Sequence, residues 1–117
     1  MLLKVTDHPE ATIIHIKGRL DSATAPELES QVLSSLEGGR QHLVLDFSEL
    51  EYINSAGLRI LVLGYQRLHP LGGQVMVCGV KDYIAEVFDI SGYNRVFRMC
   101  PDLDQAIRYL SAPPDGQ

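Results

Sequence analysis

A short and almost continuous apolar run, Leu43 to Phe47, limits the folds open to this chain more than any other segment. Such a run, without polar alternation, is typical of a central strand that is buried on both faces. Apolar residues at helical spacing flank it on both sides. They are Leu28, Val32 and Leu36 before the run, and Leu58, Leu61, Val62, Tyr65 and Leu68 after it. This order of helix, strand and helix predicts βαβ units with parallel strands.

Other periodic segments extend the alternation to most of the chain. Apolar and polar residues alternate at 2–6 and 12–17, which predicts two strands paired as a hairpin around His8-Pro9-Glu10. The remaining predicted elements are a buried strand at 74–80, a helix that ends near Ser91-Gly92, a short edge strand at 96–99 and a helix at 103–110. We therefore expect an α/β fold: a small mixed β-sheet of four to five strands, with about four helices packed mainly on one side.

The length of 117 residues fits a single domain, which we place at 2–111, followed by a disordered C-terminal tail at 112–117. The net charge of −5, without a cluster of Lys or Arg, argues against binding to nucleic acid or to an anionic membrane. No apolar run approaches the roughly 20 residues that span a bilayer, and the first ten residues lack a signal-peptide pattern. These observations favour a cytoplasmic protein.

The cysteines and histidines give no sign of a metal or redox site. Cys78 and Cys100 are not spaced as a CxxC motif, and Cys78 lies in a predicted buried strand, so we expect plain core thiols. The four histidines are scattered and do not have metal-ligand spacing. We expect no metal, no cofactor and no catalytic residue.

The segment Asn54-Ser55-Ala56-Gly57-Leu58 lies where a strand gives way to a helix. N–H groups at a helix start lack intrahelical partners and carry partial positive charge, so they can hold an anion. A hydrolase nucleophile would need glycine two residues before the serine, where this chain has Ile53. Ser55 is therefore either the N-cap of the helix or a regulatory phosphoserine. If Asn54 or Ser55 is the N-cap, the N3 position is Gly57 or Leu58. Neither can close a capping box, which leaves part of the helix start available to a ligand.

Glycine in that first helical turn has two explanations that the residue alone does not separate. Gly57 either makes room for a ligand or allows tight packing against a neighbouring element.

A second strand-to-helix turn, Gly18 to Thr24, is expected at the same edge of the sheet. Its Asp21 is either a solvated turn carboxylate or a group that faces Ser55. Thr24 and Glu27 are spaced as a capping box for the following helix, with Pro26 in its first turn. Asp46, at the expected end of the central strand, is a further candidate for the same cavity.

Several of these motifs together resemble one known family. The segment Phe47 to Leu58 looks like the signature of STAS domains, the anti-sigma factor antagonists. The turn Gly18 to Ala25 is similar to the second signature of that family, and Gly72 to Val75 and Phe88 to Gly92 match in order and spacing. The likeness covers about residues 2–111. It implies the STAS fold, in which a small mixed sheet carries helices mainly on one side.

The resemblance also implies a function called partner switching. The unphosphorylated protein would bind an anti-sigma factor that is also a serine kinase, and would thereby free a sigma factor. Phosphorylation, which would fall on Ser55, would release the kinase, and a PP2C-type phosphatase would restore the active form. The family's turn aspartate falls on Asp21, and the resemblance places partner contacts at Asp21, Asn54, Ser55, Ala56, Gly57 and Leu58.

One departure from the family pattern concerns the residue before the phosphoacceptor. Many members have aspartate there, whereas this chain has Asn54, which can cap a helix but carries no charge. The alternative function is an accessory STAS subunit of a transport or lipid-trafficking system, in which the same edge would contact an ATPase. Either protein would be a monomer or a weak dimer, since the sheet is expected to have an exposed edge strand.

Overall fold

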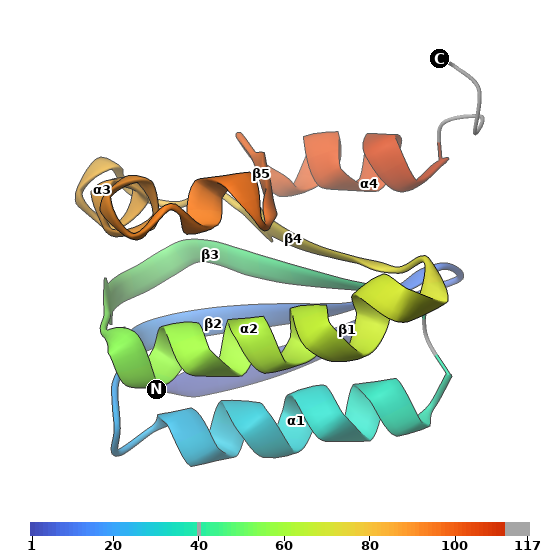
Figure 1. Ribbon diagram of the computed structural model, residues 1–117, viewed down its shortest axis with the longest axis horizontal. Coiled ribbons are helices and arrows are strands. Elements are labelled where there is room, and N and C mark those ends of the chain that lie inside the picture. Colours follow the sequence, from blue (N-terminus) through green and yellow to red (C-terminus); the bar gives the residue numbers. More distant parts are fainter. Residues whose placement is uncertain (40, 112–117) are drawn as a thin grey trace.

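Five strands form one mixed sheet in the order β1-β2-β3-β4-β5 (Figure 1). The computed structural model describes residues 1–39 and 41–111, so the tail expected at 112–117 lies outside the described residues. The first strand pairs antiparallel with the second, and the other pairings are parallel. The strands are β1 (Leu2–His8), β2 (Ala11–Leu20), β3 (His42–Ile53), β4 (Gln74–Cys78) and β5 (Arg98–Cys100). The helices are α1 (Ala25–Glu37), α2 (Ser55–Leu68), α3 (Asp82–Ser91) and α4 (Leu103–Ser111), with short 3-10 turns η1 (His69–Leu71) and η2 (Tyr93–Arg95).

The sheet separates two hydrophobic cores, because side chains alternate between its faces along each strand. In β3, Leu43 and Leu45 belong to the larger core, while Val44 belongs to the smaller one. The larger core also receives buried residues of α1, α2 and α3. Of the four helices in the described part of the chain, only α4 packs on the other face, through Ala106 and Leu110. The expected mixed sheet with helices mainly on one side is therefore confirmed.

The central strand is longer than the sequence predicted, which is a correction to the connection expected at 48–53. β3 continues for 12 residues, to Ile53. Its register with β2 shifts twice. Between Asp46 and Glu49, β3 has two residues where β2 has one, and between Leu50 and Tyr52 it has one residue where β2 has none. Such bulges break the two-residue period, so the second half of the strand does not show the alternation that predicts one.

The second strand is also longer than expected, since it passes through Gly18 and ends at Leu20. Gly18 has φ of +102°, a left-handed conformation that other residues adopt with strain. The ends of both extended strands, Leu20 and Ile53, are register partners. The two strands therefore deliver the turn after β2 and the start of α2 to one edge of the sheet.

Candidate functional site

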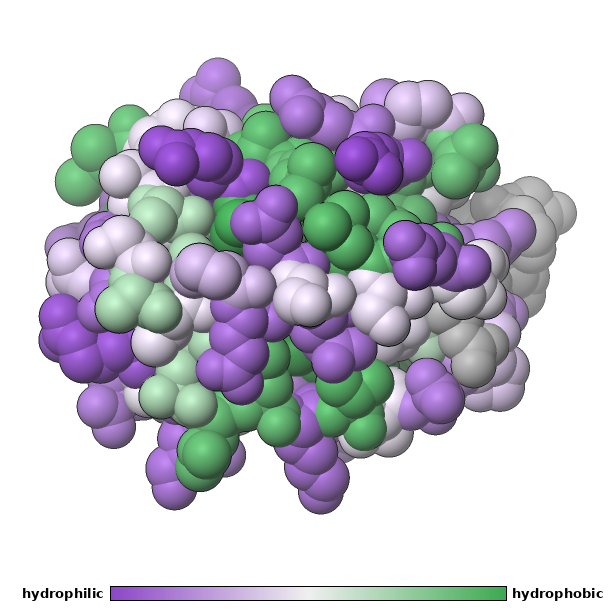
Figure 2. All heavy atoms as spheres, turned by 90° about the horizontal axis from the view of Figure 1, so that it is seen from below, coloured by the Kyte–Doolittle hydropathy of each residue, from purple (hydrophilic) through white to green (hydrophobic). Residues whose placement is uncertain are grey.

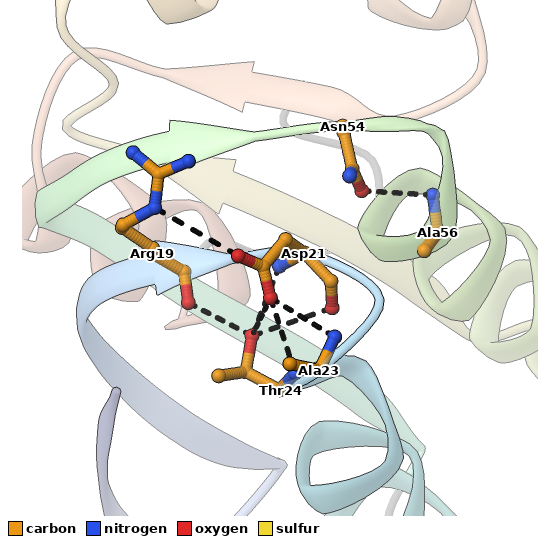
Figure 3. A network of polar contacts seen from close by, with 6 residues as sticks. All are labelled: Arg19, Asp21, Ala23, Thr24, Asn54 and Ala56. Atoms are coloured by element: carbon orange, nitrogen blue, oxygen red, sulfur yellow. Dashed lines mark hydrogen bonds and ion pairs between the residues drawn. The ribbon is translucent and has the colours of Figure 1, made fainter.

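The start of α2 is capped by the residue before Ser55. Asn54 has extended backbone angles, φ −127° and ψ −171°, and its Oδ1 accepts a hydrogen bond from the N–H of Ala56 at 3.0 Å (Figure 3). This is the usual N-cap geometry. Of the two residues considered for the N-cap, Asn54 has this role. The N-cap role considered for Ser55 is wrong, because Ser55 is already the first residue of the helix. As expected, no capping box forms at the start of α2. The side chain of Asn54 alone caps the helix.

The hydroxyl of Ser55 is accessible. The residue is exposed, and no hydrogen bond joins its side chain to another residue in the described parts of the chain. The first helical bond of α2 is the one from the N–H of Leu58 to the carbonyl of Asn54, at 3.0 Å. The N–H groups of Ser55 and Gly57 precede it and have no intrahelical partner. The first turn contains no acidic residue, so an anion placed at this end would meet a favourable field.

The turn at Asp21 is held together by its own carboxylate. Asp21 Oδ1 accepts the N–H of Ala23 at 3.0 Å and the N–H of Thr24 at 3.2 Å, and Arg19 Nε lies 3.7 Å from Oδ2 (Figure 3). Desolvation alone would raise the pKa of Asp21, but these N–H groups, the Thr24 hydroxyl and Arg19 together lower it. No hydrogen bond between Asp21 and Ser55 occurs among the described residues. Of the two roles considered for Asp21, the structure therefore supports that of a turn carboxylate over that of a group facing Ser55.

The capping box predicted for α1 does not form. Thr24 is the N-cap residue, but its side chain makes no capping bond. Its Oγ1 instead donates to the carbonyl of Arg19 at 2.8 Å and accepts the N–H of Asp21 at 2.9 Å. The Thr24 hydroxyl, which the sequence pattern predicted to cap α1, thus stabilises the tight turn after β2 instead. Pro26 does lie in the first turn, as expected.

The two turns are joined by backbone and by close packing. The N–H of Asn54 donates to the carbonyl of Leu20 at 3.2 Å, which ties the cap of α2 to the residue before Asp21. A Cβ added at Gly57 would lie only 2.6 Å from Leu20 Cγ and 3.0 Å from Ile53 Cγ1. Gly57 is buried, so packing explains this glycine rather than room for a ligand. The sequence analysis did not single out Leu20, because it is one of many apolar residues at a strand end.

Two side chains at the start of α3, the N-cap Lys81 and Tyr83, bind the end of β3. Lys81 Nζ donates to the carbonyl of Leu50 at 3.0 Å, and the Tyr83 hydroxyl donates to the carbonyl of Glu51 at 2.8 Å. These bonds satisfy carbonyls next to the bulged part of the strand. The sequence gives no sign of them, because the two donors and their acceptors lie about thirty residues apart.

Asp46 does not belong to this site, contrary to the sequence prediction. It precedes Ile53 by seven residues of strand, which at roughly 3.3 Å per residue corresponds to about 23 Å. Its Oδ2 lies 2.8 Å from His15 Nδ1, and its Oδ1 accepts the N–H of Ser48 at 3.1 Å. Desolvation raises the pKa of Asp46, but these hydrogen bonds outweigh it and leave the pKa below its usual value.

The cysteines are free thiols in packed surroundings. Cys78 is fully buried and Cys100 partly so, and burial raises the pKa of Cys78 to about 12. Within residues 1–39 and 41–111, no three His, Cys, Asp or Glu side chains are grouped so that they could hold a metal ion. The described helices include none that is long and apolar enough to cross a membrane.

Comparison with known proteins identifies the family. Residues 3–106 match the STAS domain family. A Bordetella bronchiseptica protein described as a candidate anti-sigma factor antagonist, BtrV, is 37% identical over 82 residues, which are 70% of this chain and 71% of that protein. The chain therefore belongs to the STAS domain family, and its relatives are named anti-sigma factor antagonists.

Solved structures share the fold over nearly the whole chain. An anti-sigma factor antagonist from Mycobacterium paratuberculosis has a TM-score of 0.86 and 27% identity, covering 95% of this chain and 94% of that one. The Bacillus cell fate determinant SpoIIAA in its phosphorylated form has a TM-score of 0.75 and 17% identity, with coverage of 93% and 99%. At that identity the second likeness concerns the fold alone.

Proposed function

We propose that this protein is an anti-sigma factor antagonist that is switched by phosphorylation of Ser55. The observation that carries the proposal is the exposed hydroxyl of Ser55 at the first position of α2, beside N–H groups that lack intrahelical partners. The protein is a regulator rather than an enzyme, and it acts in the cytoplasm, where sigma factors act. A solved structure of the same fold, SpoIIAA in its phosphorylated form, supports the view that the fold tolerates a phosphate.

The proposed partner is an anti-sigma factor with serine kinase activity of the histidine-kinase-like ATPase type. The unphosphorylated protein binds it through the surface around Asn54, Ser55 and Ala56, and a sigma factor is released. Along α2, Ala56 and Val62 are hydrophobic residues that are only partly buried, so this helix offers a partner some apolar surface. Seen from the side of α1, hydrophobic residues are interspersed with hydrophilic ones on the surface of the molecule (Figure 2).

Phosphorylation would act through charge rather than through a change of fold. A phosphate adds about −1.5 to −2 charges, which the N-terminus of α2 would stabilise within the free protein. A partner packed on that helix would have to desolvate this charge or meet it with its own acidic groups. We therefore propose that the phosphate weakens kinase binding with little change in the backbone, and that a PP2C-type phosphatase reverses the effect.

The experiment incubates the purified protein with its candidate kinase and ATP, and measures the intact mass. The wild-type protein should gain one phosphate, and Ser55→Ala should gain none. Ser22→Ala is the matched control, because Ser22 is an exposed serine in the neighbouring turn and its loss should leave phosphorylation unchanged. Unmodified wild-type protein with a genuine cognate kinase would contradict the proposal and favour an accessory role in a transport or lipid-trafficking system.

A further inference from the structure

Two arginines line a shallow hollow beside β5, far from Ser55. The hollow has a volume of about 420 Å³, and Arg95, Arg98 and Gln74 lie in its wall. A second hollow of about 350 Å³ adjoins it and shares Gln74 and Arg98. Tyr65 and His69, at the C-terminal end of α2, line this second hollow. The 14 residues of α2 correspond to about 20 Å at 1.5 Å per residue, which separates the hollow from Ser55 at the other end. The proposed phosphorylation site at the other end of α2 therefore does not account for it.

The side chain of Arg98 is held in place by α4. Its Cζ lies 3.9 Å from the ring centroid of Tyr109, so the guanidinium stacks on the phenol ring. The Tyr109 hydroxyl in turn accepts a hydrogen bond from Gln74 Nε2 at 3.3 Å. A stacked guanidinium still presents its N–H groups in its own plane, where they can bind the oxygens of an anion as a pair. Because three elements fix this arginine before any ligand arrives, binding would cost little further ordering.

The charge of the hollow contrasts with that of the protein. The chain carries a net charge of −5, yet Arg95 and Arg98 are both exposed, and neither forms an ion pair with any carboxylate of the described residues. Two acidic residues from neighbouring segments have other partners: Asp89 Oδ1 accepts Asn94 Nδ2 at 2.9 Å, and Asp102 Oδ1 accepts the N–H of Gln105 at 2.9 Å. Two such cations in one hollow match a dianion.

The adjoining hollow has room and a suitable wall for the rest of a ligand. Tyr65 and His69 both line it, with ring centroids 4.9 Å apart and planes inclined by 22°. Stacked rings leave the outer face of the stack and the ring edges open, and a small apolar or aromatic group can pack against these. We propose that the hollow beside β5 binds a small phosphate monoester, with Arg95 and Arg98 on the phosphate and the body of the molecule along Tyr65 and His69.

The test uses the full chain and phenyl phosphate as the probe, in ¹H–¹⁵N NMR titrations at constant ionic strength. The proposal predicts saturable shifts at the amides of Gln74 and residues 95–99. Arg98→Gln and Arg95→Gln should each weaken binding about tenfold or more, because each removes charged hydrogen bonds to the phosphate. Lys17→Gln removes the same charge from an exposed position on β2 and should leave the affinity within about twofold.

Further arms separate the roles of charge, aromatic contact and position. Benzoate, a monoanion with the same ring, should bind about tenfold more weakly than phenyl phosphate, and inorganic phosphate should bind at the arginines without shifting the amides near Tyr65 and His69. Tyr109→Phe keeps the ring and should retain binding, whereas Tyr109→Leu should weaken it. Spectra of each variant without ligand show whether it is folded.

Three results would overturn the proposal. They are shifts that do not saturate, equal losses in Lys17→Gln and Arg98→Gln, and benzoate binding as tight as that of phenyl phosphate. The first two would indicate general attraction of anions to the surface, and the third would show that the site does not select a dianion.

Discussion

Gly57 and Leu20 are in direct packing contact, so close that a Cβ on Gly57 would lie 2.6 Å from Leu20 Cγ. The contact fixes how the first turn of α2 sits on the end of β2. Together with the hydrogen bond from the N–H of Asn54 to the carbonyl of Leu20, at 3.2 Å, it positions Ser55 relative to the Asp21 turn. The geometry of the proposed phosphorylation site therefore depends on a glycine that does not itself contact a ligand.

The first prediction concerns this glycine. Gly57→Ala should lower the free energy of unfolding by about 1–3 kcal/mol, because overpacking against Leu20 exceeds the gain in helix propensity of about 1 kcal/mol. Gly64→Ala is the matched control on the same helix, since its Cβ would meet Leu43 Cδ2 at 3.4 Å, near ordinary contact distance. That variant should be as stable as the wild type or more stable. Urea unfolding measures both, and equal effects would contradict the packing account.

The second prediction concerns the cap of α2. Asn54→Ala removes the acceptor for the N–H of Ala56 and should cost about 1 kcal/mol of stability. Asn54→Asp keeps an acceptor and adds a negative charge at the helix N-terminus, so it should match or exceed wild-type stability by about 0.3–1 kcal/mol at neutral pH. The comparison uses urea unfolding at low salt. A loss in Asn54→Asp as large as that in Asn54→Ala would show that the carboxylate cannot take over the cap.

The third prediction concerns pH. Burial lowers the pKa of His42 from its usual 6.5, and the opposite effect of Glu10 is smaller. The neutral ring accepts the N–H of Gln74 on Nδ1 at 3.1 Å, a role that protonation abolishes. Between the folded pKa and 6.5 the unfolded chain binds more protons, so stability falls as pH falls through that window. His42→Gln should reduce this slope in urea unfolding from pH 7 to pH 5, and an unchanged slope would contradict the assignment.

The fourth prediction concerns the backbone of the phosphorylated protein. Because the N–H groups at the start of α2 can donate hydrogen bonds to an anion, phosphorylation of Ser55 should shift amide NMR signals only near that turn. Signals of α2 beyond its first two turns, and of α1, should remain in place. Widespread changes along α2 would contradict a switch that acts by local charge.

The sequence predicted the main elements of the fold because their patterns are local. The apolar run from Leu43 to Phe47, and the helical spacing that follows it, do not depend on distant contacts. The second half of β3 was missed because two bulges remove its alternation. The role of Thr24 was missed because its hydroxyl bonds to the carbonyl of Arg19, five residues away, in a turn whose shape the sequence does not reveal.

The sequence predicted some residues of the candidate site correctly and others not. Ser55 was placed correctly at a helix start, since strand, polar residue and helical pattern follow one another directly. The sequence left the cap open between Asn54 and Ser55, and left Gly57 open between packing and room for a ligand. Deciding both requires knowledge of where the helix begins and of Leu20 beneath it. Asp46 was assigned to the wrong place because β3 was predicted to end at Phe47, whereas it continues through two bulges to Ile53.

The central claim is that a phosphate on Ser55 directly weakens binding of the anti-sigma factor. The most direct measurement compares the dissociation constant of the candidate anti-sigma kinase for unphosphorylated protein with that for protein carrying one phosphate on Ser55. We expect the phosphate to weaken binding by tenfold or more, equivalent to about 1.4 kcal/mol. Equal dissociation constants for the two forms would contradict the account.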